Sequence, residues 1–184
     1  DVGDAPINPI DVSQSIESIE NFFREMHAEC VVPVSVGGDH TVPLPIFRAI
    51  ASKNQPIGIV HFDAHADTLD ELCGSKVNHA TTFRRGVEEG LIDPKRTVQI
   101  GLRGTRYGDD DLSYSHDAGM RVIDIEEYEQ LGREKVITEV HRVIGNGPTY
   151  ITFDIDGLDP IYAIGTGVPE PGGLSMRDCQ VIIR

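Results

Sequence analysis

The sequence predicts an α/β fold with three layers, in which helices cover both faces of a mostly parallel central sheet. Short apolar runs rich in Val and Ile alternate with longer segments of helical periodicity along the whole chain. Strands that alternate with helices in this way are typical of parallel sheets. The 184 residues suggest one domain over residues 1–184, since chains divide at roughly 100–200 residues per domain.

The first helix is predicted over residues 13–29, with Ser13 or Ser15 as its N-cap. Its apolar residues recur at helical spacing, at Ile16, Ile19, Phe22, Phe23 and Met26. This amphipathic pattern indicates a helix that lies on the surface of the domain and packs one face against it.

The next two elements follow directly. Residues 31–36 form a short apolar, β-branched run, which predicts a buried strand that a Gly-Gly pair ends. A second helix is predicted over residues 41–53. Pro43 and Pro45 are compatible with this helix only if both lie in its first turn, where a missing N–H removes no hydrogen bond.

The rest of the chain continues the alternation. Strands are predicted at residues 57–62, 97–101, 121–125 and 150–153. The polar segment that follows residues 57–62 is mostly loop. Helices are predicted at residues 81–89, at residues 133–144 and from Ser175 onward. The last helical pattern is cut off at Arg184 and the chain begins abruptly at Asp1, so both ends look incomplete.

Composition excludes several classes of partner. A formal net charge of −14 argues against nucleic acid and anionic membranes, and mostly reflects an acidic surface. No apolar run approaches the ~20 residues of a membrane helix, and residues 1–4 do not resemble a signal peptide. Three distant cysteines, Cys30, Cys73 and Cys179, argue against a disulfide framework and favour a reducing cytosol.

Three polar clusters each begin where a predicted strand ends: residues 37–40 (Gly-Gly-Asp-His), 63–67 (Asp-Ala-His-Ala-Asp) and 154–160 (Asp-Ile-Asp-Gly-Leu-Asp-Pro). Open parallel sheets bind ligands at the carboxyl ends of their strands, so one sheet would bring the clusters together. Side chains alternate along extended backbone, which places Asp63, His65 and Asp67 on one face.

The clusters together predict a metal centre. Their candidate ligands are four carboxylates and two imidazoles, namely Asp63, Asp67, Asp154, Asp156, His40 and His65. So many carboxylates repel one another unless cations separate them, and no Lys or Arg lies within the clusters. Two divalent ions resolve this repulsion, and a set rich in oxygen and free of thiolates favours Mn²⁺ over structural zinc.

Simpler interpretations apply to each cluster alone. A lone Asp-x-Asp is often a turn device, and a lone histidine is usually a core residue; the other histidines, His27, His61, His116 and His141, are taken as structural or surface residues. Residues 154–157 are similar to the start of a calcium loop, but Gly165 stands where that loop needs Glu. They are also similar to the motif of aspartyl-phosphate phosphatases, in which Thr stands in place of Leu158.

At these residues the chain resembles the ureohydrolases, the family of arginase, agmatinase, guanidinobutyrase and guanidinopropionase. The matching segments are residues 37–40, 63–67 and 152–160, and residues 1–4 resemble the family's segment before its first long helix. The resemblance implies an arginase-like fold and a binuclear manganese site, with Ni²⁺ or Co²⁺ as alternative ions.

The resemblance also implies roles for individual residues. One ion would be held by His40, Asp63, Asp67 and Asp154, and the other by Asp63, His65, Asp154 and Asp156. A bridging hydroxide would attack the carbon of a guanidino substrate, and Asp67 would orient it and carry its proton to the leaving amine. The products are an amine and urea.

Two further residues are candidates for contact with substrate. His79 matches a family histidine at the pocket mouth, a proton shuttle or substrate contact, and the alternative is that it only starts a helix. The loop at 165–174 is of the agmatinase or guanidino-acid hydrolase type, in which Glu170 either meets the guanidinium or shapes the loop. Val168 departs from the pattern, which commonly has Thr there.

The expected partner is therefore a cationic guanidino small molecule, and family analogy implies a homo-oligomer, a trimer or hexamer. Relative to the family, an N-terminal segment and a C-terminal segment with a guanidinium-binding glutamate are expected to be missing. Two alternatives stay open: a non-catalytic ureohydrolase-like subunit, and a phosphatase that uses Asp154 as its nucleophile.

Overall fold

The computed structural model describes residues 2–29, 31–108 and 111–184. Its centre is a four-stranded sheet in the order β3-β2-β1-β4, and all three strand pairs are parallel. The strands are β1 (Ile57–Phe62), β2 (Ile92–Leu102), β3 (Arg121–Asp124) and β4 (Thr149–Phe153). Both the predicted fold class and the four predicted strands of this sheet are confirmed.

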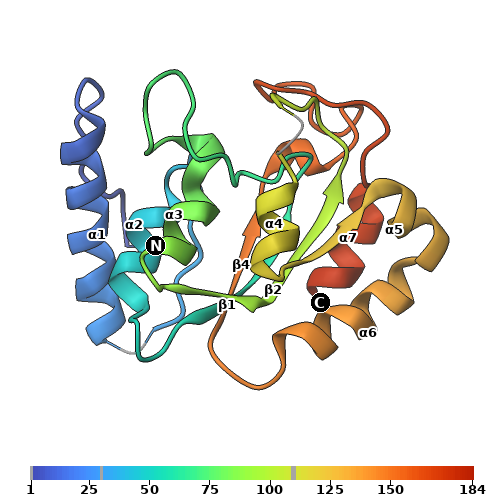
Figure 1. The fold of residues 1–184 in the computed structure, drawn as a ribbon. Coiled ribbons are helices and arrows are strands. Elements are labelled where there is room, and N and C mark those ends of the chain that lie inside the picture. The colour runs from blue at the N-terminus through green and yellow to red at the C-terminus, as the bar shows by residue number, and fades with distance from the viewer. Residues whose placement is uncertain (1, 30, 109–110) are drawn as a thin grey trace.

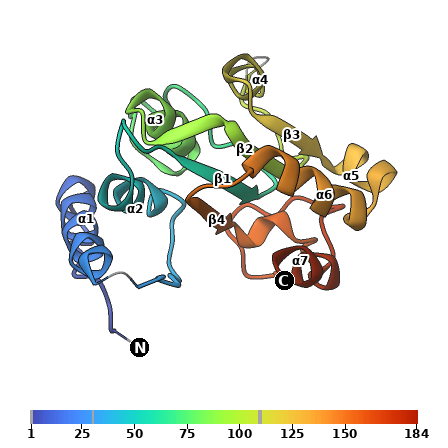
Figure 2. The ribbon, with the colours of Figure 1, turned by 90° about the horizontal axis from the view of Figure 1, so that it is seen from below.

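Helices lie on both faces of the sheet and on the outer side of one layer (Figure 1; Figure 2). They are α1 (Val12–Ala28), α2 (Pro43–Ile50), α3 (Thr82–Glu88), α4 (Ser113–Ala118), α5 (Ile125–Leu131), α6 (Arg133–Ile144) and α7 (Met176–Ile183). Two short 3-10 helices, η1 (His79–Thr81) and η2 (Ile155–Gly157), lie in the loops beside the sheet.

Each face of the sheet has its own hydrophobic core, because successive side chains of a strand point to opposite faces. Val60 and Phe62 of β1 pack with α5, α6 and α7, through residues such as Val136. Ile59 faces the other way and packs with Phe83 of α3 and with α2. Helix α1 then packs on α2, on the outer side of the layer that α2 and α3 form (Figure 2).

The first helix was placed correctly, but its predicted cap is wrong. Asp11, rather than Ser13 or Ser15, is the N-cap, and its Oδ1 accepts a hydrogen bond from the backbone N–H of Gln14 at 3.0 Å. The hydroxyl of Ser15 instead donates to the carbonyl oxygen of Asn8 at 2.8 Å. Ser15 therefore fixes the chain that leads into the helix.

The predicted strand at residues 31–36 is wrong. The segment is irregular, and Val32, Val34 and Val36 are almost fully exposed. A strand needs a hydrogen-bonding neighbour, and none of the four strands of the sheet pairs with this segment, which lines a cavity instead. Composition indicates that a segment is suited to a strand, but the neighbour depends on tertiary structure.

Other boundaries differ for local reasons. Strand β2 begins at Ile92, five residues before its predicted start. The prediction starts late because the Asp-Pro at 93–94 has the composition of a turn. In the structure this Asp-Pro lies where the pairing of β1 with β2 is irregular, between Ile57 and Ile59. The short helices α4 and α5 were not predicted, although the side chain of Asp124 caps α5 through the N–H of Glu127.

The helices and two of the three cysteines lie among the described residues. Among these residues, none of the helices has the length and apolar character needed to span a bilayer. Cys73 is exposed and Cys179 is buried, and both are free thiols. The predictions that involve Asp1 and Cys30 lie outside the described residues.

Candidate metal centre

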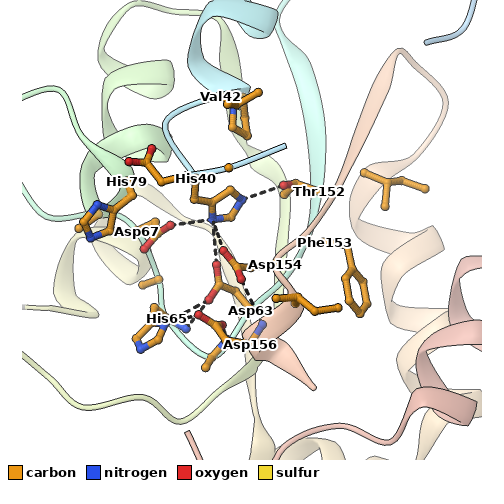
Figure 3. Close-up of a pocket in the computed structure, with 18 of the residues that line it drawn as sticks. His40, Val42, Asp63, His65, Asp67, His79, Thr152, Phe153, Asp154 and Asp156 are labelled. Atoms are coloured by element: carbon orange, nitrogen blue, oxygen red, sulfur yellow. Dashed lines mark hydrogen bonds and ion pairs between the residues drawn. The ribbon is translucent and has the colours of Figure 1, made fainter. Parts of the chain in front are cut away.

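All six predicted ligands lie at the carboxyl ends of two neighbouring strands (Figure 3). The loop after β1 supplies Asp63, His65 and Asp67, and the end of β4 supplies Asp154 and Asp156. His40 comes from the turn that leads into α2. Adjacent parallel strands end at the same edge of a sheet, so residues about 90 positions apart in the sequence meet there.

His40 is at the centre of one half of the cluster. Its Nδ1 lies 2.8 Å from Asp67 Oδ2, 3.1 Å from Asp63 Oδ2 and 3.3 Å from Asp154 Oδ2. Its Nε2 lies 2.9 Å from the hydroxyl of Thr152, which fixes the plane of the ring. Three carboxylates therefore converge on one imidazole nitrogen.

His65 is at the centre of the other half. Its Nδ1 lies 3.3 Å from Asp156 Oδ2 and 3.4 Å from Asp63 Oδ1. Backbone donors fix both carboxylates: the N–H of His65 donates to Asp63 Oδ1 at 2.7 Å, and the N–H of Ala64 donates to Asp156 Oδ1 at 3.1 Å. Asp63 contacts both histidines and so joins the two halves.

The side chains converge by a different geometry from the one that alternation along extended strands predicts. Residues 63–67 form a bent loop, and Asp67 has a left-handed φ of 52°. Asp156 lies within η2, and its backbone N–H donates to Asp154 Oδ1 at 3.1 Å. A left-handed non-glycine residue costs about 1–3 kcal/mol and is found where the surrounding structure requires it, often at functional sites.

Burial and mutual repulsion change the acidity of the carboxylates. Burial, together with the neighbouring charge of Asp63, raises the pKa of Asp67 to about 7. Burial also raises the pKa of Asp156 to about 6, although its hydrogen bond to His65 opposes the rise. Burial alone would raise the pKa of Asp63 too, but His61, His40 and His65 together hold it well below its usual range.

The pKa values of the two histidines at the centres of the cluster are raised as well. Hydrogen bonds to Asp156 and Asp63 raise the pKa of His65 to about 11. Burial opposes a charge on His40, yet hydrogen bonds to Asp63 and Asp67 outweigh it and hold the pKa of His40 well above its usual range. Without a metal, protons on the imidazoles offset the charge of the carboxylates.

The donor set fits divalent cations. Two groups of three side chains have ligand atoms within 4.8 Å of one another: His40 with His61 and Asp63, and Asp63 with His65 and Asp156. Carboxylate oxygens and imidazole nitrogens without thiolates suit Mn²⁺ and similar ions. Two divalent ions would take the place of the protons that the histidines otherwise carry.

A cavity of about 1610 Å³ opens beside the cluster. The ligand side chains line it, and so does His79, an exposed residue at the start of η1. Thr166 and Val168 of the loop at 165–174 also line it, whereas Glu170 is not among the described residues that do. His79 is therefore placed to contact a bound molecule more directly than Glu170.

Glu170 instead joins two loops. Its Oε1 accepts a hydrogen bond from the N–H of Thr105 at 2.8 Å and lies 3.6 Å from His65 Nε2. The carbonyl oxygen of Glu170 accepts from Arg103 at 2.7 Å. These contacts favour the interpretation in which Glu170 shapes the loop and orients His65.

Arg103, at the end of β2, connects this loop to the ligand loop. Its guanidinium donates to six backbone carbonyls, those of Gly101, Asp156, Gly157, Leu158, Glu170 and Pro171, at 2.7–3.2 Å. Gly104 permits the close approach beside it, because a Cβ there would overlap the ring of His65.

Two other functional neighbours were missed. His61, assigned to structure or surface, is fully buried and donates to Asp63, and Gln99 contacts His61 from β2. Both are polar residues within apolar strands, and that contrast with their surroundings is the signal that could have singled them out. By comparison, His27, His116 and His141 are exposed.

Replacing Arg103 by Lys is expected to destabilise the metal-free protein by a few kcal/mol. A lysine has one nitrogen and cannot reach all six carbonyls, and each buried acceptor left without a donor costs about 1–3 kcal/mol. Chemical denaturation measures the change. Arg142→Lys is the control, since Arg142 is exposed and forms an ion pair with Glu139 on the surface of α6. A similar loss in both variants would contradict the assignment.

The fold and the site together define a class: α/β proteins with carboxylate and imidazole side chains that could hold metal ions at the carboxyl edge of a parallel sheet. A profile of the Arginase family matches residues 1–184. The chain belongs to this family, whose members are metal-dependent.

Two curated relatives match over all of this chain. It is 52% identical to a guanidinopropionase of Pseudomonas aeruginosa and 45% identical to a mitochondrial agmatinase of Gallus gallus. It spans 58% and 54% of their lengths. Among solved structures, the proclavaminate amidino hydrolase of Streptomyces clavuligerus superposes with a TM-score of 0.89 at 34% identity, over 98% of this chain and 60% of that one.

Proposed function

We propose that the protein hydrolyses a linear guanidino compound to an amine and urea, using two Mn²⁺ ions. The observation that carries the proposal is the contact of four carboxylates and two imidazoles at one sheet edge, beside an open cavity. Membership of the arginase family and the names of the relatives support the reaction class.

The contacts suggest how the ligands divide. His40 would hold one ion together with Asp63, Asp67 and Asp154, and His65 would hold the other together with Asp63, Asp154 and Asp156. When bound, a pair of divalent ions lowers the pKa of water and supplies a nucleophile near neutral pH. Asp63 and Asp154 would be shared, and the backbone N–H groups that they accept from hold their carboxylates in place.

Asp67 is the proposed acid–base group. Its side chain is 9% exposed at the cavity beside the cluster. A carboxylate within hydrogen-bond reach of the reacting atoms can accept and return a proton. Asp67 would take a proton at Oδ2 and pass it to the leaving amine, with His79 as the next group along the cavity.

The substrate would be a guanidino acid or agmatine. A guanidinium is cationic, and the chain keeps a formal net charge of about −10 when two divalent ions are added to its −14, which favours a cationic substrate. Relatives at 52% and 45% identity are a guanidinopropionase and a guanidinobutyrase of Pseudomonas aeruginosa. We also propose that the protein is cytosolic and forms a homo-oligomer, a trimer or hexamer. Light scattering on the full-length protein would test the oligomeric state.

The experiment is a substrate panel. Full-length protein loaded with Mn²⁺ would be assayed for urea with guanidinopropionate, guanidinobutyrate, agmatine and arginine, and for phosphate with phosphate esters. Urea from at least one guanidino compound and no phosphate is the expected result. Phosphate release would instead favour Asp154 as a nucleophile, and the absence of both products would favour a non-catalytic subunit.

Manganese affinity is expected to rise with pH. Bound ions require deprotonated ligands, whereas His65 has a pKa of about 11, Asp67 about 7 and Asp156 about 6 without metal. At acidic pH all three groups carry protons that the metal must displace. As the pH rises, the two carboxyl groups lose their protons first. At neutral pH the proton on His65 still has to be displaced. Calorimetry in buffers of different protonation enthalpy should detect more than one proton released per chain, and an affinity independent of pH would contradict this.

A further inference from the structure

His61 lies in a chain of three hydrogen bonds that ends on Asp63. It is fully buried in β1, directly opposite Gln99 of β2. Gln99 Nε2 lies 2.8 Å from the carbonyl oxygen of Ala66 and 3.0 Å from His61 Nδ1. His61 Nε2 lies 2.7 Å from Asp63 Oδ2.

The direction of every bond in this chain follows from its first acceptor. A carbonyl oxygen only accepts, so Gln99 must present its amide nitrogen, rather than its oxygen, to Ala66. The second proton of that nitrogen then points at His61 Nδ1, which must accept it and therefore carries no proton. In the neutral ring the proton is on Nε2, which donates to Asp63 Oδ2.

We propose that His61 is a positioning residue for the metal centre: its Nε2–H, polarised from Ala66 through Gln99, fixes the carboxylate that both ions share. This inference rests on the proposed two-ion site. The inference also means that His61 is not a metal ligand, although ligand atoms of His61, His40 and Asp63 lie close enough together to hold one ion. A nitrogen that carries a proton cannot be a metal ligand.

The geometry around Asp63 shows what the contact achieves. Oδ2 accepts from His61, and Oδ1 accepts from the N–H of His65 at 2.7 Å. Each carboxylate oxygen also has one imidazole nitrogen close to it, His40 Nδ1 at 3.1 Å from Oδ2 and His65 Nδ1 at 3.4 Å from Oδ1. The two hydrogen bonds hold the plane of the carboxylate, so that each oxygen keeps a lone pair for a cation that would take the place of the imidazole proton.

The protonation of the ring can be observed without metal or substrate. In metal-free full-length protein labelled with ¹⁵N, long-range ¹H–¹⁵N correlation distinguishes the two ring nitrogens of a histidine. The expected spectrum shows His61 Nε2 protonated and Nδ1 bare, and Gln99→Met serves to assign the signals by their shift. A proton on Nδ1, with Nε2 bare, would overturn the proposal whatever the protein does with manganese.

A matched pair of variants tests the donor itself. Glutamine at position 61 places an amide N–H near the former Nε2, whereas asparagine places its amide near the former Nδ1 and leaves Asp63 without this donor. Loss of an outer partner typically weakens metal binding by about 10–100-fold. His61→Asn is therefore expected to weaken Mn²⁺ binding by about that factor in calorimetric titration, and His61→Gln is expected to stay within about threefold of wild type.

Thr97→Val controls for the loss of a buried polar contact on the same strand face. Thr97 is 1% exposed, lies two residues before Gln99, and donates to the carbonyl oxygen of Asp93 at 2.9 Å, away from the cluster. It is expected to change unfolding temperature but not Mn²⁺ affinity. Where His61→Asn fails to fold, Gln99→Met keeps the imidazole, removes its polarising donor, and is expected to weaken binding by about tenfold.

The outcomes separate the inference from the function it rests on. Equal losses in His61→Asn and His61→Gln, or wild-type affinity in His61→Asn, would overturn the positioning role while leaving the metal site intact. If wild-type protein binds no Mn²⁺, the proposed function fails instead, and the ring-nitrogen spectrum still decides whether Ala66 and Gln99 direct the proton of His61 toward Asp63.

Discussion

Asp67→Asn is expected to lower kcat by about 10²–10⁴-fold while most of the manganese stays bound. Asparagine keeps an oxygen that can act as a ligand beside His40, and it leaves the other three carboxylates of the cluster unchanged. It cannot accept the proton that must reach the leaving amine. The loss should therefore appear in kcat with little change in KM, as for a group that acts in the transition state.

Metal content and kinetics must be measured on the same sample of full-length protein. Asp117→Asn is the control, because Asp117 is an exposed carboxylate in α4, away from the cluster. It should keep wild-type turnover. If Asp67→Asn holds both ions and turns over near the wild-type rate, Asp67 is only a ligand, and His79 becomes the next candidate for the proton path.

Asp63→Asn is expected to lose manganese itself, unlike Asp67→Asn. Its affinity for Mn²⁺ should fall at least about 100-fold, since about 100-fold is the upper end of the loss when a residue that only contacts a metal ligand is replaced. Asp63 is the carboxylate that contacts both His40 and His65. Its two oxygens accept from His65 N–H and His61 Nε2–H, so asparagine must turn its NH₂ toward a donor in either orientation. Both the shared charge and the geometry are lost.

Elemental analysis after gel filtration measures the metal content, and urea release at high Mn²⁺ shows whether excess ion restores activity. Asp67→Asn is the matched comparison, since it makes the same chemical change four residues away in the same loop. If Asp63→Asn retains as much manganese as Asp67→Asn, Asp63 is not shared between two ions, and the proposed division of ligands is wrong.

The sequence predicts the sheet and the place of the site because both depend on local patterns. The run at 57–62 is apolar except for His61 and is followed by a polar segment, which is typical of a buried strand. The polar clusters follow two such strands, and parallel neighbours end at one edge. Order along the chain was therefore enough to bring Asp63 and Asp154 together.

What could not be predicted depends on contacts between distant residues. The run at 31–36 has the composition of a strand but has no neighbour to pair with among the described residues. His61 and Gln99 gain their role only because β1 and β2 place them opposite each other. Arg103 finds carbonyl acceptors in loops more than 50 residues away.

A stoichiometric titration tests the central claim most directly. Metal-free full-length protein would receive increasing Mn²⁺ while urea release from the best substrate of the panel is followed. Because one carboxylate contacts both halves of the cluster, activity is expected to depend on filling both and to reach its plateau at two equivalents per chain. Full urea release without added metal, or a plateau at one equivalent, would contradict a two-ion site.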